Sequence, residues 1–455
     1  MKRPHPRAIR LALALALGPF PVGGGETGTI AIAPVPDDAR PQLSPALATH
    51  PGGGLLVWQQ GRLHQASRNT DILARRLDAS GRPYGQTIVL CRAPGPQVRP
   101  RVACRSDGGC LVVWQDMRNG RDWDVYAARV ASDGRVLDAG GRALARGPRS
   151  QALPAVASDG QRFAVIWQHM AEDGFYELHA SHVAWRGGPG SARAAPLLYT
   201  PRQARRWLGY TPGWGWKRAP VSPARQGSRH VLGGQPRLIG LADRRWLLAW
   251  QDQANWQPGH SNWTRLAILH ATADAFTLTR VTESPVPLFG QHPGVLARSP
   301  ARILRATVLV TGRGGLSRFG LAAVADSSTL AWQPAPPGAA PGRWRPLWRR
   351  WLVPLFEERA VEGPAGAAWA HGRFVIAARA STFTREKAPA RILLSVHDDD
   401  GRPLGTLAAF DGKGAVRDPV LAATADGLLL AFSHDAEGNG LWRIRLVRIS
   451  RQALP

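Results

Sequence analysis

Two stretches of the chain combine basic side chains with tryptophan, a pairing of residue types that suits an anionic polymer. Trp185–Gln235 is rich in arginine and contains no acidic residue. The second stretch, from about Asp326 to Arg350, ends in the run Arg343-Trp-Arg-Pro-Leu-Trp-Arg-Arg-Trp351. Guanidinium groups make bidentate contacts to carboxylate, sulfate or phosphate, and indole rings stack on sugars or bases or enter a lipid interface. The candidate binding residues are therefore Arg205, Arg206, Trp207, Trp214, Trp216, Lys217, Arg218, Trp344, Arg345, Trp348, Arg349, Arg350 and Trp351.

Other side chains that could do chemistry do not assemble into a reactive set. His179 and His182 are three residues apart on an expected strand, so they point to opposite faces. The run Asp398-Asp-Asp400 aligns with hairpin turns elsewhere in the chain, and the adjacent Glu357 and Glu358 diverge in a strand. No Ser/His/Asp or Cys/His arrangement and no metal-ligand spacing can be assembled. The sequence therefore predicts no catalytic residue, no metal ion and no cofactor.

Two of the three cysteines lie at the ends of one turn. Cys104 and Cys110 flank Arg-Ser-Asp-Gly-Gly in the expected hairpin Pro100–Asp116. Opposed residues of a hairpin have Cα atoms about 4.5–5.5 Å apart, which suits a disulfide. A disulfide indicates an oxidising compartment. Cys91 has no evident partner, and we interpret it as a small core residue.

The elements that must position these residues come from a repeat. The hairpin Pro100–Asp116 belongs to the best-preserved copy of a repeated unit, which has four short strands. Its strand-ending tryptophan has counterparts in neighbouring copies, at intervals of about 50 residues, which is the period of propeller blades. We interpret these tryptophans as core residues between blades; they are Trp58, Trp114, Trp167 and Trp250. The glutamines that follow them are expected to bond loop backbone or to line one channel mouth; they are Gln59, Gln115, Gln168 and Gln251.

The end of the repeat explains the start of the chain. The seventh copy runs out at Ser450–Pro455 without a fourth strand, whereas Thr29–Ala33 has no partner before it. We therefore expect the N-terminal strand to complete the last blade, since closure removes sheet edges that invite aggregation. The predicted fold is all-β: a single β-propeller over residues 28–455 with seven four-stranded blades. Six or eight blades remain open, because copies four and five are worn.

The two basic stretches interrupt the repeat, at about residues 186–230 and 327–350. If Leu352–Phe356 is the fourth strand of copy five, both interruptions lie between third and fourth strands and emerge on one face of the disc. The polar loops between second and third strands then lie on the opposite face. They could hold a sugar or Ca²⁺, but none has a recognisable calcium spacing, and we interpret them as solvated turns. The insertions have a structural alternative, as solvated loops or as a cover for a blade side formed by Trp207, Trp214 and Trp216.

The N-terminus has the pattern of a secretory signal. Basic residues between Lys2 and Arg10 precede the apolar run Leu11–Leu17, which is too short to span a bilayer. Residues 1–25 are expected to be removed, without a clean Ala-x-Ala site to mark the cut. The protein is therefore predicted to be secreted or periplasmic, with no transmembrane segment. The net charge of +26 is explained equally by a codon preference for arginine and by a surface that binds polyanions.

One resemblance follows from the repeat. The pattern Pro-x-Val-Ala, Asp-Gly-Gly-x-Leu-Val-Val-Trp-Gln-Asp, Asp-Val-Tyr-Ala-Ala-Arg-Val and Asp-Gly-Arg resembles repeats of secreted bacterial β-propeller proteins. The resemblance covers Pro45–Val183 well and the remainder loosely. It implies export and a propeller but no chemistry. The chain lacks the Asp-box of sialidases and the Gly-His and Trp-Asp signature of WD-repeat proteins.

The sequence favours a binding scaffold over an enzyme. The expected partner is an anionic polysaccharide or other envelope component, or a protein, contacted through the face that bears the insertions. Export argues against a nucleic-acid partner. The alternative function is that of a glycosidase or lyase, with separated residues converging at the channel mouth. The oligomeric state is not predicted.

Overall fold

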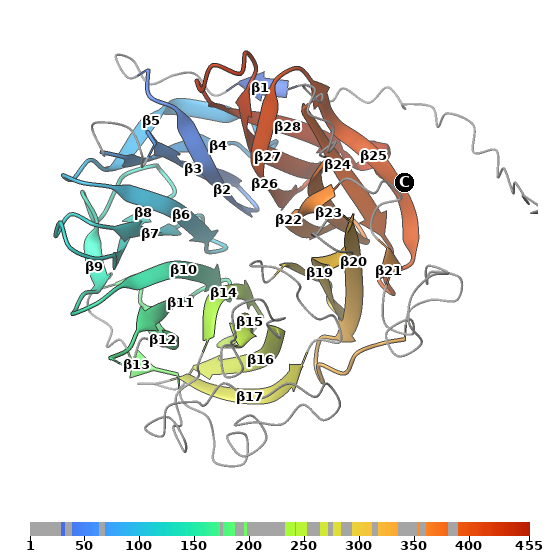
Figure 1. Cartoon of the computed structure of the whole chain (residues 1–455), viewed down its shortest axis with the longest axis horizontal. Coiled ribbons are helices and arrows are strands. Elements are labelled where there is room, and N and C mark those ends of the chain that lie inside the picture. The colour runs from blue at the N-terminus through green and yellow to red at the C-terminus, as the bar shows by residue number, and fades with distance from the viewer. Residues whose placement is uncertain are drawn as a thin grey trace, which may run out of the picture.

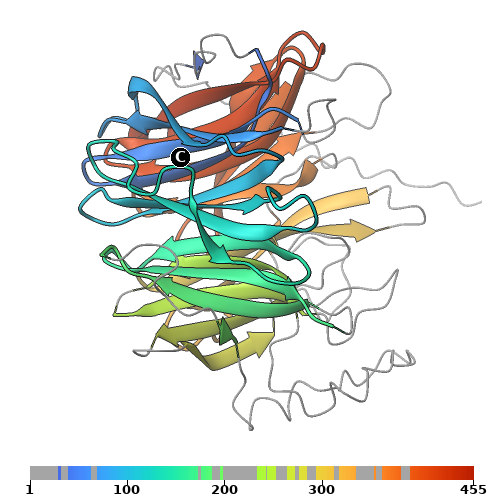
Figure 2. The ribbon, with the colours of Figure 1, turned by 90° about the vertical axis from the view of Figure 1, so that its left-hand side faces the viewer.

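The computed structural model describes residues 29–31, 39–62, 69–172, 176–186, 195–197, 233–241, 243–252, 264–271, 276–283, 294–311, 317–334, 353–354, 361–380 and 390–455. These residues form seven four-stranded antiparallel sheets arranged as the blades of a β-propeller (Figure 1). Seen from the side of blades 1 to 3, the strands cross the thickness of the disc and the sheets stack around the ring (Figure 2). The predicted seven-bladed fold is confirmed.

Each blade runs outward from the channel in chain order. Blade 1 consists of β2 (Gln42–His50), β3 (Gly53–Gln60), β4 (Asp71–Leu77) and β5 (Pro83–Cys91). Blade 2 consists of β6 (Gln97–Cys104), β7 (Cys110–Asp116), β8 (Asp124–Val130) and β9 (Arg142–Ala145). Blade 3 consists of β10 (Gln151–Ser158), β11 (Phe163–Met170), β12 (Tyr176–Val183) and β13 (Ala195–Pro196).

The later blades keep the same order despite their worn sequences. Blade 4 consists of β14 (Gly233–Gly240), β15 (Arg245–Asp252), β16 (Thr264–Ala271) and β17 (Phe276–Glu283). Blade 5 consists of β18 (Val295–Arg298), β19 (Arg302–Thr311), β20 (Ser317–Asp326) and β21 (Val353–Pro354). Blade 6 consists of β22 (Val361–Ala370), β23 (Arg373–Ala380), β24 (Ala390–His397) and β25 (Pro403–Gly412).

Blade 7 is built from both ends of the chain. Its inner strands are β26 (Ala415–Thr424), β27 (Gly427–Asp435) and β28 (Arg443–Ser450). Its outer strand is β1 (Thr29–Ala31), which pairs antiparallel with β28 so that Thr29 lies opposite Val447. The N-terminal strand therefore completes the last blade, as the sequence predicted. Pairing with β1 covers the outer edge of β28, which an incomplete blade would leave open.

The core lies between neighbouring blades rather than in one central cluster. Alternate residues of each second strand face opposite neighbours, because side chains on a strand alternate between its two faces. In blade 3, Trp167 packs toward blade 2, whereas Ile166 packs toward blade 4. At most 1% of the surface of each recurring tryptophan is exposed. Their predicted role in the core is confirmed.

The cysteines lie as expected. Cys104 and Cys110 are opposite each other on β6 and β7 and form a disulfide. Cys91 is a buried free thiol at the end of β5. Burial raises the pKa of Cys91 to about 11, so the thiol stays protonated at neutral pH.

The disc has two faces that differ in their connections. We call the face where the first strand of each blade begins the entry face; it carries the connections from second to third strands and from each blade to the next. The opposite face, the hairpin face, carries tight turns such as those at Asp107 and Asp133. This division follows from four antiparallel strands in sequence order.

Candidate functional site: the channel ring

The innermost strands share an unusual backbone conformation near the entry face. In five blades, within the described residues, a non-glycine residue immediately before a proline has a positive φ of 50–54°. Strand pairing shifts by one residue at each of these points. Such conformations cost about 1–3 kcal/mol each and persist where the surroundings enforce them, often at functional sites. We call these five residues the channel ring: Ser44, Arg99, Leu153, Gln235 and Asp418.

The recurring glutamines help to hold this conformation. The Oε1 atom of Gln115 accepts a hydrogen bond of 3.1 Å from the backbone N–H of Leu153 in the next blade. Gln168 accepts an equivalent bond of 3.2 Å from the N–H of Gln235. Both glutamines are buried, so these bonds are shielded from water. Gln115 and Gln168 therefore bond loop backbone, one of the two roles expected from the sequence, and they tie Leu153 and Gln235 to the blade before.

Two arginines follow the ring at equivalent places. Arg101 and Arg237 each stand two residues after a ring residue and directly after its proline. Their guanidinium groups fold back in the same way: Nη1 of Arg101 donates to the carbonyl of Pro100 at 2.9 Å, and Nη1 of Arg237 to that of Pro236 at 3.2 Å. Both side chains are half-buried, whereas Arg99 is exposed. Blades 2 and 4 thus present guanidinium groups at one level of the channel wall.

Electrostatic interactions show that these groups act on one another across the channel. Burial lowers the pKa of Arg101, and the positive charge of Arg99 lowers it further, while Asp418 opposes both effects. The pKa of Arg237 is lowered to about 9. Burial has the largest effect, and the positive charges of Arg101 and Arg99 act in the same direction. The interacting residues belong to blades 2, 4 and 7, which are not adjacent. Charged groups from three blades therefore lie close enough to influence one another.

The cluster has an excess of positive charge. Its acidic member, Asp418, is already paired with Arg417, whose Nε lies 3.0 Å from Oδ2. No ion pair joins Arg99, Arg101 or Arg237 to a carboxylate in the described part of the chain. Guanidinium groups held together in a partly dry site repel one another, because the local dielectric constant is lower than that of water. An anion bound between them relieves that repulsion.

All of the binding residues predicted from the two insertions lie outside the described residues. The strands around the insertions are described, however, and they correct one expectation. The strand β13 (Ala195–Pro196) pairs with β12, so the fourth strand of blade 3 lies inside the first basic stretch. The candidates from Arg205 to Arg218 thus belong to the connection between blades 3 and 4, whose flanking strand ends lie on the entry face. The second insertion lies between β20 and β21 and starts from the hairpin face. The expectation that both emerge on one face is wrong.

Two other sequence interpretations are confirmed. His179 lies beside Trp167 on the side of blade 3 that faces blade 2, whereas His182 stacks on Phe276 of blade 4. These histidines therefore cannot ligate one ion together. The run after β24 is a hairpin turn, in which the N–H of Asp398 donates to the carbonyl of Arg402. Among the described residues, no group of three His, Cys, Asp or Glu side chains could hold a metal ion.

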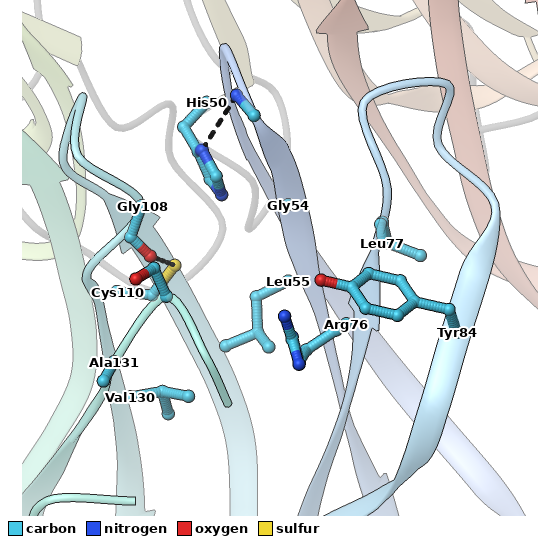
Figure 3. Close-up of a pocket in the computed structure, with 12 residues that line it drawn as sticks. His50, Gly54, Leu55, Arg76, Leu77, Tyr84, Gly108, Cys110, Val130 and Ala131 are labelled. Atoms are coloured by element: carbon cyan, nitrogen blue, oxygen red, sulfur yellow. Dashed lines mark hydrogen bonds between the residues drawn. The ribbon is translucent and has the colours of Figure 1, made fainter. Parts of the chain in front are cut away.

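A small cavity lies between blades 1 and 2 near the hairpin face (Figure 3). Its volume is about 30 Å³, and its lining includes His50, Arg76, Tyr84 and Cys110. The guanidinium carbon of Arg76 lies 4.4 Å from the ring centre of Tyr84, which leaves the side chain stacked rather than free. A cavity of this size has room for one water molecule and not for a sugar.

The channel arginines were not among the residues predicted from sequence. The available signal was the repeated Pro-Arg pair, Pro100-Arg101 and Pro236-Arg237, at the start of two first strands. The described part of the chain also contains no helix long and apolar enough to cross a membrane.

Comparisons with known proteins give distant similarities in fold. No family model and no curated protein matches the chain. A Trypanosoma rangeli sialidase in complex with sialic acid is 9% identical, covering 92% of this chain and 56% of the sialidase, with a TM-score of 0.45. A neuraminidase-like protein from A/bat/Guatemala/164/2009 is 6% identical over 93% of this chain and 94% of that one, with a TM-score of 0.42. The chain spans little more than half of the sialidase, and similarity at this level assigns no activity.

Proposed function

We propose that this protein is an exported scaffold that binds an anionic polymer at the entry face of the propeller. The observation that carries the proposal is the group of three guanidinium side chains, Arg99, Arg101 and Arg237, inside the ring. They converge from two blades and interact across the channel. Asp418, the described carboxylate that acts on Arg101, is also paired with Arg417. The site is therefore charged to receive an anion.

Carboxylate and sulfate groups suit this arrangement best. Planar guanidinium groups form paired hydrogen bonds with such anions, and these charge-assisted bonds are stronger than neutral ones. Binding also replaces repulsion among the arginines by attraction. An anionic polysaccharide or another anionic envelope component provides such groups in series, and a protein partner with an acidic segment would present the same chemistry.

The first basic insertion supports a polymer over a single small ion. Its candidate residues, from Arg205 to Arg218, are connected to strands whose ends lie on the entry face. We propose that they extend the binding surface outward from the channel between blades 3 and 4. The strand ends that flank the second insertion lie on the hairpin face, so the proposed surface does not include it. A polymer that extends beyond the channel mouth would contact both the channel ring and the first insertion.

The experiment compares two variants that lose the same charge from opposite faces. The ring variant carries Arg99→Gln, Arg101→Gln and Arg237→Gln; the control variant carries Arg82→Gln, Arg135→Gln and Arg162→Gln, all on turns of the hairpin face. Binding to polygalacturonate, heparin and neutral dextran is measured by biolayer interferometry at several salt concentrations. We expect the ring variant to lose about tenfold or more in affinity for the anionic polymers, and the control to lose much less. Equal losses in the two variants would overturn the proposal.

The same samples test the alternative function, that of a glycosidase or lyase at the channel mouth. Such an enzyme shortens the polymer, so reducing ends or unsaturated products are measured after incubation. If products form with the wild type but not with the ring variant, the protein is an enzyme and the scaffold proposal is wrong.

A separate variant with Arg205, Arg206, Lys217 and Arg218 changed to Gln tests the insertion. We expect it to weaken binding to long chains while leaving short oligomers unaffected.

A further inference from the structure

The loop between the second and third strands of blade 7 has oxygen-bearing side chains at alternate positions. It reads Asp435-Ala-Glu-Gly-Asn-Gly440, starting at the last residue of β27 and leading toward β28. Carboxylate or amide groups at positions 1, 3 and 5, followed by glycine at position 6, match the first half of an EF-hand calcium loop, with Glu437 where Asp or Asn is usual. Gly440 has a φ of +86°, the conformation for which that pattern needs glycine.

Hydrogen bonds draw the three side chains over the loop. The Oδ2 atom of Asp435 accepts the backbone N–H of Gly440 at 2.9 Å. The amide of Asn439 donates to Glu437 at 2.8 Å, and its Oδ1 accepts the N–H of Leu441 at 2.9 Å. The three oxygen-bearing side chains therefore gather around one short turn.

One oxygen of this loop is buried without a hydrogen bond. Asp435 is only 5% exposed, and its Oδ1 atom has no hydrogen-bond partner. Because Oδ2 of the same carboxylate bonds to Gly440, Oδ1 lies at the loop as well. Burying a carboxylate oxygen without a partner is unfavourable, and such atoms often mark the place of an ion or an ordered water. This atom points to a cation independently of the sequence pattern.

We propose that the Asp435–Gly440 loop binds Ca²⁺. The side chains of Asp435, Glu437 and Asn439 and the carbonyl of Leu441 supply oxygen ligands, and water molecules complete the coordination. Hard oxygen donors suit Ca²⁺, whereas Zn²⁺ prefers nitrogen and sulfur and Mg²⁺ demands a strict octahedron. The sequence alone did not indicate calcium, because the second half of the twelve-residue pattern, with its final glutamate, is missing.

The surroundings set the expected affinity. The guanidinium group of Arg62 lies beside Gly440, and Arg443 follows two residues after Leu441. These positive charges and the missing glutamate weaken cation binding, so we expect a dissociation constant of about 10⁻⁴–10⁻³ M, the range of extracellular calcium modules. Such a site is filled where Ca²⁺ is millimolar, in agreement with the predicted export.

A cation in this loop would act on the junction that closes the ring. The carbonyl of Trp442 accepts the backbone N–H of Gln42, and Oε1 of Gln42 accepts the N–H of Ile444. The loop is thus fastened to the first strand of blade 1. Ordering the loop with Ca²⁺ stabilises the contact between blade 1 and blade 7, the blade that β1 completes.

The experiment uses the full chain after treatment with a chelator. Ca²⁺ binding is measured by isothermal titration calorimetry, and Tb³⁺ luminescence is excited through Trp442, which adjoins the loop. We expect one saturable site, with Asp435→Asn weakening Ca²⁺ binding by about tenfold or more. Asn at this position can still accept the Gly440 bond, which protects the fold. The control is Asp159→Asn, a turn aspartate of the hairpin face that accepts the backbone N–H groups of Gln161 and Arg162.

A second variant tests the proposal without changing a buried side chain. Glu437→Gln combined with Asn439→Ala changes only exposed side chains and should weaken Ca²⁺ binding to a similar extent. The proposal is refuted if the wild-type chain takes up no Ca²⁺ at 10 mM, well above the expected range. It is equally refuted if folded Asp435→Asn and the double variant both bind as tightly as the control.

Discussion

Acid sensitivity of blade 6 depends on one buried histidine. His397 is fully buried at the end of β24. Its Nδ1 lies 3.1 Å from the carbonyl of Gly401, to which it donates, so Nε2 accepts the hydroxyl of Ser395 at 2.7 Å. Burial lowers the pKa of His397 from 6.5 to about 4, although the bond to Gly401 and the charge of Asp398 favour protonation. The folded protein therefore keeps a neutral ring at a pH where the unfolded chain has already taken up a proton.

The sign and size of the effect follow from this difference. The contribution of neutral His397 to stability is fully present above the pKa that the histidine has in the unfolded chain. It is lost as the pH falls toward the lower pKa that His397 has in the folded protein. Between pH 7 and pH 4.5 the loss amounts to about 2 kcal/mol, because each unit of pKa difference corresponds to about 1.4 kcal/mol. His397→Gln retains a donor and an acceptor but does not titrate. Its free energy of unfolding should therefore fall less on acidification than that of the wild type.

The assay is urea unfolding at pH 7 and pH 4.5, followed by tryptophan fluorescence. The difference between the two proteins isolates His397, since all other titrating groups are common to both. We expect the loss of unfolding free energy on acidification to be smaller in the variant by about 2 kcal/mol. An equal loss in both proteins would show that His397 is protonated, or exposed to water, in the folded state.

Three further predictions concern the frame of the propeller. Trp114→Phe should destabilise the protein by about 1–3 kcal/mol more than Trp167→Phe, because Nε1 of Trp114 donates to a buried carboxylate at 2.8 Å whereas that of Trp167 has no partner; equal losses in urea would contradict this. Deleting residues 1–38, and with them Thr29–Ala31, should expose the edge of blade 7 and cause concentration-dependent light scattering; a monomeric deletion variant would count against closure. Replacing Cys104 and Cys110 by serine should cost about 2 kcal/mol, as measured by urea unfolding with and without reductant; no change would show that the bond is dispensable.

The architecture was predictable because it rests on a repeat that the buried core imposes. Trp58, Trp114 and Trp167 recur where each second strand packs against the neighbouring blade, and burial of this kind leaves a regular trace in sequence. The closure by Thr29–Ala31 followed from counting strands. The fourth strand of blade 3 was not recognisable, because Ala195–Pro196 is too short to show alternation. Because this strand was missed, the first insertion was assigned to the wrong connection and therefore to the wrong face.

The channel ring could not be predicted, because no short sequence pattern indicates its backbone conformation. A residue before proline is expected to be extended, so the positive φ of Arg99 or Asp418 is invisible in sequence. In blades 3 and 4 the conformation coincides with a shift in strand pairing and with a backbone hydrogen bond to a glutamine of the preceding blade. The convergence of Arg101 with Arg237 depends on two blades that are separated by a third. Such a site becomes visible only when the ring is closed.

The pairing of β1 with β28 also sets an order of events in time. Synthesis makes Thr29–Ala31 first and its partner Arg443–Ser450 last, so the strand must wait for almost the entire chain. Closing so long a loop costs only a little more free energy than closing a short one, because the cost grows with the logarithm of length. The delay is kinetic: the edge of β28 stays open until the two ends meet. A circular permutant that begins at β2 and carries β1 after β28 would remove that wait, and its last blade could fold as soon as it is made.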